Sequence, residues 1–266
     1  MVSKHIYFFW GNSVMSWMRY MTLYSFCKFN PEWDITLYLS KHDVNNKTWR
    51  MKNIQDFFSY KGENYIDKIH DLGITVEVTE EYRDMTPSHA SNFFKWDILA
   101  NSGGIYADMD ILWVKPFDDF YDSFKDYDVA ICQTDMVSIG LLGSSGNKFF
   151  GDILENTFKN YNKSRYQSAG VESIYDLYNC DHGDVFKEGI NSYPYLKFFN
   201  IPMEVVYPFS SKQTDMVFGG DGELSRATIG YHWYAGHPTA QKYNNILTGE
   251  NYKEYNTLFT KLCSII

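Results

Sequence analysis

Two aspartates separated by one residue, Asp108 and Asp110, are the side chains of this sequence best suited to chemistry. They close a short apolar stretch, residues 105–107, that is typical of a β-strand. In an extended chain, side chains two positions apart point to the same side, so these two carboxylates can share one ion. Paired carboxylates suit a hard divalent cation such as Mn²⁺ or Mg²⁺, which completes its shell with water and phosphate oxygens. The alternative is a solvated turn, because this spacing of aspartates is frequent by chance.

The segment that precedes the acidic pair favours a metal site over a solvated turn. Residues 90–110 read Ala-Ser-Asn-Phe-Phe-Lys-Trp-Asp-Ile-Leu-Ala-Asn-Ser-Gly-Gly-Ile-Tyr-Ala-Asp-Met-Asp. This segment resembles the donor-site block of glycosyltransferase family 32 and its relatives, which include the yeast initiating mannosyltransferase and the glucosylating clostridial toxins. In those families a helix bearing Asp and Arg, a Gly-Gly turn and Tyr-x-Asp-x-Asp build the sugar and metal site. The resemblance implies that Asp108 and Asp110 bind the cation and that Tyr106 belongs to the donor site.

Two positions of this block depart from the family pattern. Asn92 stands where the family usually has the Asp that binds sugar hydroxyls, and Lys95 stands where it usually has Arg. Lysine keeps the positive charge but lacks the bidentate geometry of arginine, so the sugar specificity of the relatives cannot be transferred. We expect Asn92 and Lys95 to bind the donor, and Lys95 to assist catalysis by compensating phosphate or sugar charge.

The start of the chain carries a second block. Residues 5–11, His-Ile-Tyr-Phe-Phe-Trp-Gly, resemble the opening strand of the family, Ile-His-x-x-Trp-x-Gly, in which backbone groups and the Trp ring hold the nucleobase. The resemblance implies that Phe8, Phe9 and Trp10 bind the donor and that Trp10 stacks on uracil or its equivalent. The alternative is that Trp10 is a core residue, which is the commoner fate of a tryptophan in an apolar run.

A third block lies near the end of the chain, at residues 229–238, Ile-Gly-Tyr-His-Trp-Tyr-Ala-Gly-His-Pro. It resembles the late His-x-Trp-Ala-Gly-Ser segment of family 32, whose His completes the metal shell. The resemblance makes His232 the third metal ligand, and a neutral imidazole beside two carboxylates suits Mn²⁺. His237 replaces the usual Ser and is expected to touch the diphosphate. The alternative for His232 and His237 is an ordinary surface or core position, which is the commoner fate of an isolated histidine.

These blocks together predict a metal-dependent transferase that moves a hexosyl or pentosyl group from a nucleotide-sugar, in the first place a UDP-sugar, to an acceptor hydroxyl. Retention of anomeric configuration is implied by the resemblance, with the leaving phosphate oxygen taking the acceptor proton. The acceptor is a glycan, a protein or a hydroxymethylated DNA base, and residues 137–151 and 207–226 are expected to frame it. Two alternatives remain: a catalytically inactive nucleotide-sugar-binding protein and a metal-dependent hydrolase of nucleotide diphosphates.

The elements that must position these residues alternate between strand and helix. Apolar patterns predict strands over residues 4–10, 34–39, 74–78, 105–107, 128–133 and 137–143, and helices over residues 14–29, 53–59, 65–71, 88–101 and 148–161. A helix between the first two strands implies a crossover to a parallel neighbour. We therefore expect an α/β fold with a mostly parallel central sheet flanked by helices, and the resemblance implies a GT-A type nucleotide-sugar-binding sandwich. No repeat or linker divides the chain, so residues 1–266 are expected to form a single domain.

Composition excludes some partners. A net charge of −9 argues against a protein that binds nucleic acid by general electrostatics. The four cysteines, Cys27, Cys132, Cys180 and Cys263, are far apart and suggest reduced thiols, hence a cytoplasmic location. No stretch approaches the ~20 apolar residues of a membrane span, so no membrane span is expected.

Overall fold

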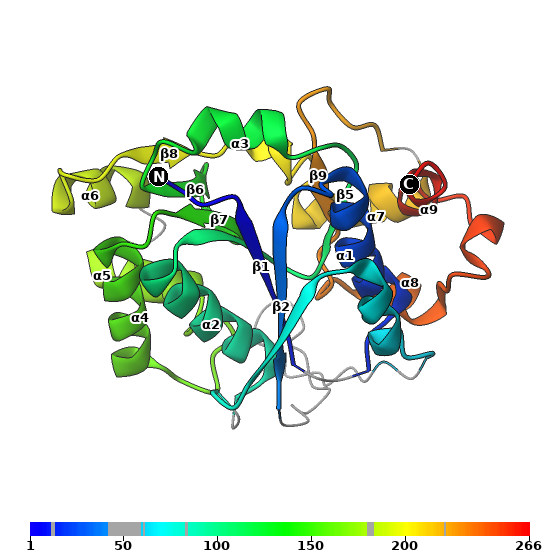
Figure 1. Ribbon diagram of the computed structural model, residues 1–266, viewed down its shortest axis with the longest axis horizontal. Helices are drawn as coiled ribbons and strands as arrows, with labels where there is room; N and C mark the ends of the chain where they lie inside the picture. Colours follow the sequence, from blue (N-terminus) through cyan, green and yellow to red (C-terminus); the bar gives the residue numbers. More distant parts are fainter. Residues whose placement is uncertain (12–13, 42–59, 61, 83–84, 180–183, 221) are drawn as a thin grey trace.

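A computed structural model of the protein describes residues 1–11, 14–41, 60, 62–82, 85–179, 184–220 and 222–266. Its larger sheet has seven strands in the order β3-β2-β1-β4-β7-β6-β8 (Figure 1). These strands are β1 (His5–Trp10), β2 (Asp34–Ser40), β3 (Thr75–Thr79), β4 (Gly104–Ala107), β6 (Val129–Gln133), β7 (Val137–Ser144) and β8 (Phe198–Asn200).

The pairing within this sheet is mostly parallel. Strands β3, β2, β1 and β4 are parallel to one another, and β8 is parallel to β6. Strand β7 is antiparallel to both β4 and β6. The parallel connection from β1 to β2 is made by helix α1 (Trp17–Phe29), which begins after Ser16, whose hydroxyl accepts the Arg19 backbone N–H at 3.3 Å. The predicted parallel crossover is therefore confirmed.

Helices cover both faces of the sheet because its central strands are apolar on both sides. In β1, Ile6 and Phe8 pack into one core cluster together with α1 and α3 (Asp118–Phe124). The alternate side chains, Tyr7 and Phe9, pack into a second cluster on the other face. That second face is covered by α2 (Pro87–Asn101), α4 (Lys148–Asn160), α5 (Val171–Tyr178) and α6 (Val185–Ser192).

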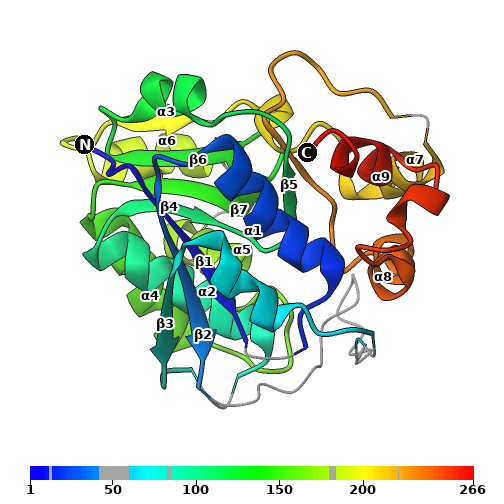
Figure 2. The ribbon, with the colours of Figure 1, turned by 45° about the vertical axis from the view of Figure 1, so that its right-hand side comes forward.

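A smaller two-stranded sheet lies beyond α1. It pairs β5 (Ile111–Trp113) with β9 (Gly230–His232), and it packs in a third core cluster with the outer side of α1. The same cluster contains residues of α7 (Thr214–Gly219), α8 (Pro238–Ile246) and α9 (Leu258–Cys263). Figure 2 shows these three helices grouped on one side of the molecule, away from β2 and β3. Short 3₁₀-helices complete the chain: η1 (Ile66–Leu72), η2 (Met203–Val205), η3 (Ser211–Gln213) and η4 (Tyr252–Glu254).

The predicted elements correspond closely to the observed ones where both exist. The helix predicted at residues 65–71 is the 3₁₀-helix η1, and the helix predicted from residue 14 begins at Trp17. The helix predicted at residues 53–59 lies outside the described residues. Within the described ranges, no helix combines the length and the apolar character that a membrane crossing requires. The single domain over residues 1–266 stays a prediction.

Candidate active site

The acidic pair lies in a turn between the two sheets. Asp108 follows β4, Asp110 precedes β5, and Met109 between them is buried in the core. The Asp108 backbone N–H donates to the Gly140 carbonyl at 2.8 Å, which fixes the start of the turn. The expectation of an extended chain at this point is wrong. The carboxylates are neighbours because the chain turns here from one sheet into the other.

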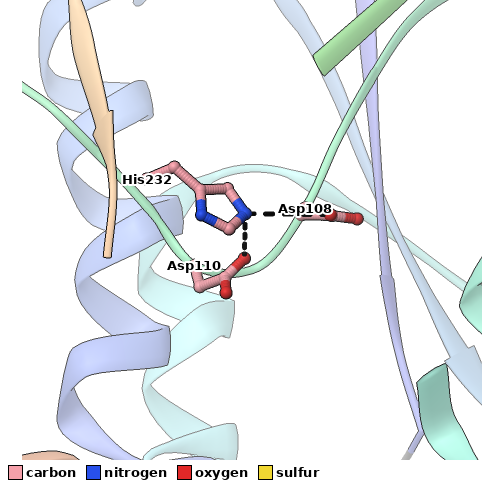
Figure 3. A group of neighbouring side chains, drawn as sticks. All are labelled: Asp108, Asp110 and His232. Carbon is pink, nitrogen blue, oxygen red and sulfur yellow. Dashed lines mark ion pairs between the residues drawn. The ribbon is translucent and has the colours of Figure 1, made fainter. Parts of the chain in front are cut away.

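His232 reaches this turn through the pairing of β9 with β5. Ile111 lies opposite His232 in the antiparallel register, and the Trp233 N–H donates to the Asp110 carbonyl at 2.9 Å. The His232 Nε2 atom is 3.2 Å from Asp110 Oδ1 and 4.0 Å from Asp108 Oδ2 (Figure 3). One ligand atom from each of the three side chains lies within 4.8 Å of the others. The structure thus brings together the three residues predicted to bind a metal.

Asp108 also has a cationic neighbour, Lys95. The Lys95 ammonium, on α2, donates to Asp108 Oδ1 at 3.2 Å and to the Ile139 carbonyl at 2.9 Å. Helix α2 ends at Asn101, and Gly103 and Gly104, both with positive φ, then turn the chain directly into β4, so that Lys95 lies beside the end of that strand.

The electrostatics of the site favour charged side chains in spite of burial. Burial opposes ionisation of Asp108, but Lys95 and His232 hold its pKa below the ordinary value. Burial likewise opposes ionisation of Asp110, and His232 outweighs it and lowers the pKa of Asp110. Burial disfavours a charged imidazole, yet the two carboxylates raise the pKa of His232 to about 9. Without a cation, His232 therefore carries a proton at neutral pH, and a cation that binds its Nε2 displaces that proton.

Gly140 lies directly against two of the three predicted ligands, Asp108 and His232. A Cβ at this position would lie 3.0 Å from Asp108 Oδ2, 3.0 Å from the Tyr207 hydroxyl and 3.1 Å from His232 Cδ2. Such contacts are shorter than van der Waals contact between these atoms. A side chain at residue 140 would therefore require Asp108, Tyr207 and His232 to shift by a few tenths of an ångström.

The acidic pair opens onto a cavity of about 270 Å³. Its walls come from the end of β1, the start of α1, one face of α2, the turn after β4, the segment before α5 and helix α8. The residues that line the cavity include Phe9, Trp10, Arg19, Asn92, Lys95, Asp108, Asp110, Ile139, Tyr166, Gln167 and Gln241. A substrate can thus approach both carboxylates from this cavity.

Four of the predicted donor residues besides Asp108 line this cavity: Phe9, Trp10, Asn92 and Lys95. Phe8 does not, because alternation along β1 turns its ring into the core cluster on the opposite face of the sheet. A donor contact from Phe8 would have to use its backbone.

The other two predicted donor residues, Tyr106 and His237, lie next to the cavity but do not line it. The Tyr106 side chain is fully buried, its hydroxyl is 2.6 Å from the Ser91 hydroxyl, and the Lys95 ammonium lies 4.8 Å from its ring centroid. His237 is the N-cap of α8, where its Nδ1 accepts the Thr239 N–H at 3.3 Å. Tyr106 supports Lys95, and His237 caps a helix that forms part of the cavity wall.

Sequence reasoning missed several cavity residues. Arg19 lies in a helix of apolar and aromatic residues, and a lone arginine there was a signal that could have been followed. Tyr166 and Gln167 come from an irregular segment before α5, and Gln241 comes from α8. These last three had no recognisable pattern, because their positions depend on elements that the sequence did not predict.

The side chain of Gln241 is buried and has no hydrogen-bond partner in the part of the chain that the structure describes. Its side chain is 4% exposed, and neither amide atom has a partner among the described residues. Unpaired buried amides are destabilising, so we expect Gln241→Leu to raise the free energy of unfolding by about 1 kcal/mol or more. Gln241→Glu should lower the free energy of unfolding, because it places a buried charge at this position. Urea unfolding of the three proteins checks both expectations, and a less stable leucine variant would contradict them.

Comparison with known proteins gives one match at the sequence level. Residues 9–131 match the family described as "Glycosyltransferase sugar-binding region containing DXD motif". The matched segment contains Trp10, Asn92, Lys95 and both aspartates, and it ends before His232. No curated protein matches the sequence significantly.

Solved structures resemble the fold at low identity. The chain matches the glycosyltransferase GlyE of Streptococcus pneumoniae TIGR4 with a TM-score of 0.51 and 10% identity, over 96% of this chain and 65% of that one. It also matches the PaToxG glycosyltransferase (TM-score 0.47, 12% identity, 99% and 87% covered) and the apo form of mouse xyloside xylosyltransferase 1 (0.48, 10%, 88% and 98%). The expected GT-A type sandwich is confirmed.

Proposed function

We propose that this chain, whose residues 9–131 match the glycosyltransferase sugar-binding region with its DXD motif, is a family 32-like glycosyltransferase that moves a sugar from a nucleotide-sugar to an acceptor hydroxyl with the help of a divalent cation. The observation that carries this proposal is the convergence of Asp108, Asp110 and His232 beside a cavity lined by Trp10. A UDP-sugar is the proposed donor, with Trp10 stacked on the base.

The three side chains fit a divalent cation. Ligand atoms about 2.1 Å from one ion lie at most about 4.2 Å apart. The separations from His232 Nε2 are 3.2 and 4.0 Å, and the ligand atoms of the two carboxylates lie within 4.8 Å of each other, so a small adjustment of these side chains brings all three onto one ion. Carboxylates suit both Mg²⁺ and Mn²⁺, and the imidazole favours Mn²⁺. When bound, the cation would stabilise the negative charge of the departing diphosphate.

The side chains of the protein have separate tasks in this proposal. Asn92 binds sugar hydroxyls from α2, in the same wall of the cavity as Lys95. Lys95 holds Asp108 in position and adds positive charge near the sugar and phosphates. His237 contacts the diphosphate after a turn of its side chain away from Thr239. Retention requires no general base from the chain, since the leaving phosphate oxygen takes the acceptor proton.

The acceptor and the location are part of the same proposal. We propose a glycan or a protein hydroxyl as acceptor before a hydroxymethylated DNA base, because a net charge of −9 disfavours DNA. Residues 137–151 are suited to face the acceptor, since Ile139 lines the cavity. A cytoplasmic enzyme is proposed from the scattered cysteines, of which Cys27, Cys132 and Cys263 are free thiols and Cys180 lies outside the described residues.

A release assay tests the proposed function. The protein is incubated with each of a panel of UDP- and GDP-sugars in Mn²⁺ or in chelator, and the free nucleotide diphosphate is measured. We expect release from a UDP-sugar that depends on Mn²⁺, and mass spectrometry of candidate acceptor pools should then find the transferred sugar. Cleavage between the two phosphates would indicate a hydrolase, and binding of UDP-sugar without any release would indicate an inactive protein.

A further inference from the structure

Arg19 lies between two tryptophan rings in the cavity wall. Its guanidinium carbon is 5.4 Å from the ring centroid of Trp10 and 4.9 Å from that of Trp233. The side chain is 20% exposed and lines the same cavity as the acidic pair. Stacking on aromatic faces fixes the plane of a guanidinium while leaving the N–H groups at its edge available.

The polar edge of Arg19 is only partly used. Its one ion pair among the described residues is with Asp110, at 3.9 Å from Nη1 to Oδ1, which is too long for a hydrogen bond. A guanidinium offers five N–H donors, and donors removed from water need partners. Lys95, the other cation of the site, already donates to Asp108 and to the Ile139 carbonyl. Arg19 is therefore the cation that has donors to offer an incoming anion.

We propose that Arg19 binds the diphosphate of the nucleotide donor from the Asp110 side of the acidic pair. This inference rests on the proposed function, because it needs a diphosphate beside the cation. A cation held by Asp110 at about 2.1 Å would lie within about 6 Å of Arg19 Nη1, so an oxygen of the diphosphate can lie between them. The positive charge of the cation also weakens the attraction of Arg19 to Asp110. The fork of the guanidinium then matches two phosphate oxygens.

Two other roles are possible for this residue, and each predicts a different result. Arg19 could orient the Trp10 ring, in which case its loss would affect the nucleoside. It could instead only compensate the charge of Asp110, in which case its loss would change cation affinity. Binding the diphosphate predicts an effect that depends on the number of phosphates in the ligand.

The test measures binding of UDP, UMP and uridine by calorimetry in saturating Mn²⁺ for the wild-type protein, Arg19→Met, Arg19→Lys and the control Lys159→Met, which removes an exposed cation of α4. We expect Arg19→Met to weaken UDP binding about 10- to 100-fold, UMP less, and uridine by less than about 2-fold. Arg19→Lys should recover part of the loss, since it keeps the charge without the fork. Lys159→Met should bind as the wild type does.

Equal weakening of all three ligands would overturn the proposal in favour of the Trp10 role. Unchanged binding of UDP would also overturn it, as would a loss confined to Mn²⁺ affinity measured without nucleotide. If Arg19→Met does not fold, Arg19→Lys provides the same comparison among the ligands. Sugar release by the wild type together with full UDP binding by the variants would reject this inference and keep the proposed function. UDP binding that depends on Arg19, without sugar release by the wild type, would keep this inference and reject the proposed function.

Discussion

Asp110→Asn is expected to lower sugar transfer by at least about 10³-fold and to abolish the effect of Mn²⁺ on donor binding. The amide keeps the shape of the side chain but removes the charge that faces His232 Nε2 at 3.2 Å. A factor of 10³ corresponds to about 4 kcal/mol of lost stabilisation of the departing diphosphate, which is the range expected of a metal-centred charge. Initial rates of nucleotide diphosphate release, with and without Mn²⁺, measure the effect.

The matched control for this variant is Asp122→Asn, which removes an exposed carboxylate of α3 that pairs with Lys125. It should transfer at the wild-type rate. Thermal unfolding of both variants separates a lost function from a lost fold. An Asp110→Asn protein that remains fully active in chelator would contradict the assignment of Asp110 as a metal ligand.

Lys95→Met is expected to lower the free energy of unfolding by about 3 kcal/mol when it is measured in chelator. Lys95 is 1% exposed and compensates the charge of Asp108, and removal of one member of a buried ion pair leaves the other uncompensated. The same variant should be stabilised by Mn²⁺ more than the wild type is, because the cation supplies positive charge beside Asp108. Urea unfolding at fixed pH, with and without Mn²⁺, checks both statements.

Two further proteins make this experiment specific. Lys125→Met breaks the exposed pair with Asp122 and should change stability by less than about 1 kcal/mol. Combining Lys95→Met with Asp108→Asn should recover part of the lost stability, since no charge is then left without its partner. Strictly additive losses in the double variant would show that Lys95 stabilises the fold through packing alone.

Much of the fold could be predicted because its central elements have strong local patterns. Strand β1 is a continuous apolar run, α1 has helical spacing that ends before Pro31, and the Gly103-Gly104 turn marks the end of α2. Strands β5, β8 and β9 have three residues each, which is too short for a periodic signal. Their existence depends on pairing with distant partners. No local reading of the sequence could have predicted it.

The site residues likewise fall into those that a local sequence pattern indicates and those that depend on distant contacts. The acidic pair, Lys95 and His232 stand in segments that resemble a known family, so their types and spacing were informative. Arg19 was not identified, because the face of α1 that meets the cavity is defined only once Trp233 packs against it. For Phe8 and Phe9, the resemblance indicated the strand but not which of the two side chains faces the cavity. Their order in the sequence does not reveal which ring faces α2, and only the pleat of β1 decides it.

The pairing of β5 with β9 has a consequence for how activity arises during synthesis. The turn with both aspartates leaves the ribosome long before residues 230–232, which align His232 with them. A nascent or truncated chain that stops short of β9 would hold the entire family-matched segment and still lack one of the three ligands. If the proposed function holds, the metal site is therefore complete only after β9 has paired with β5.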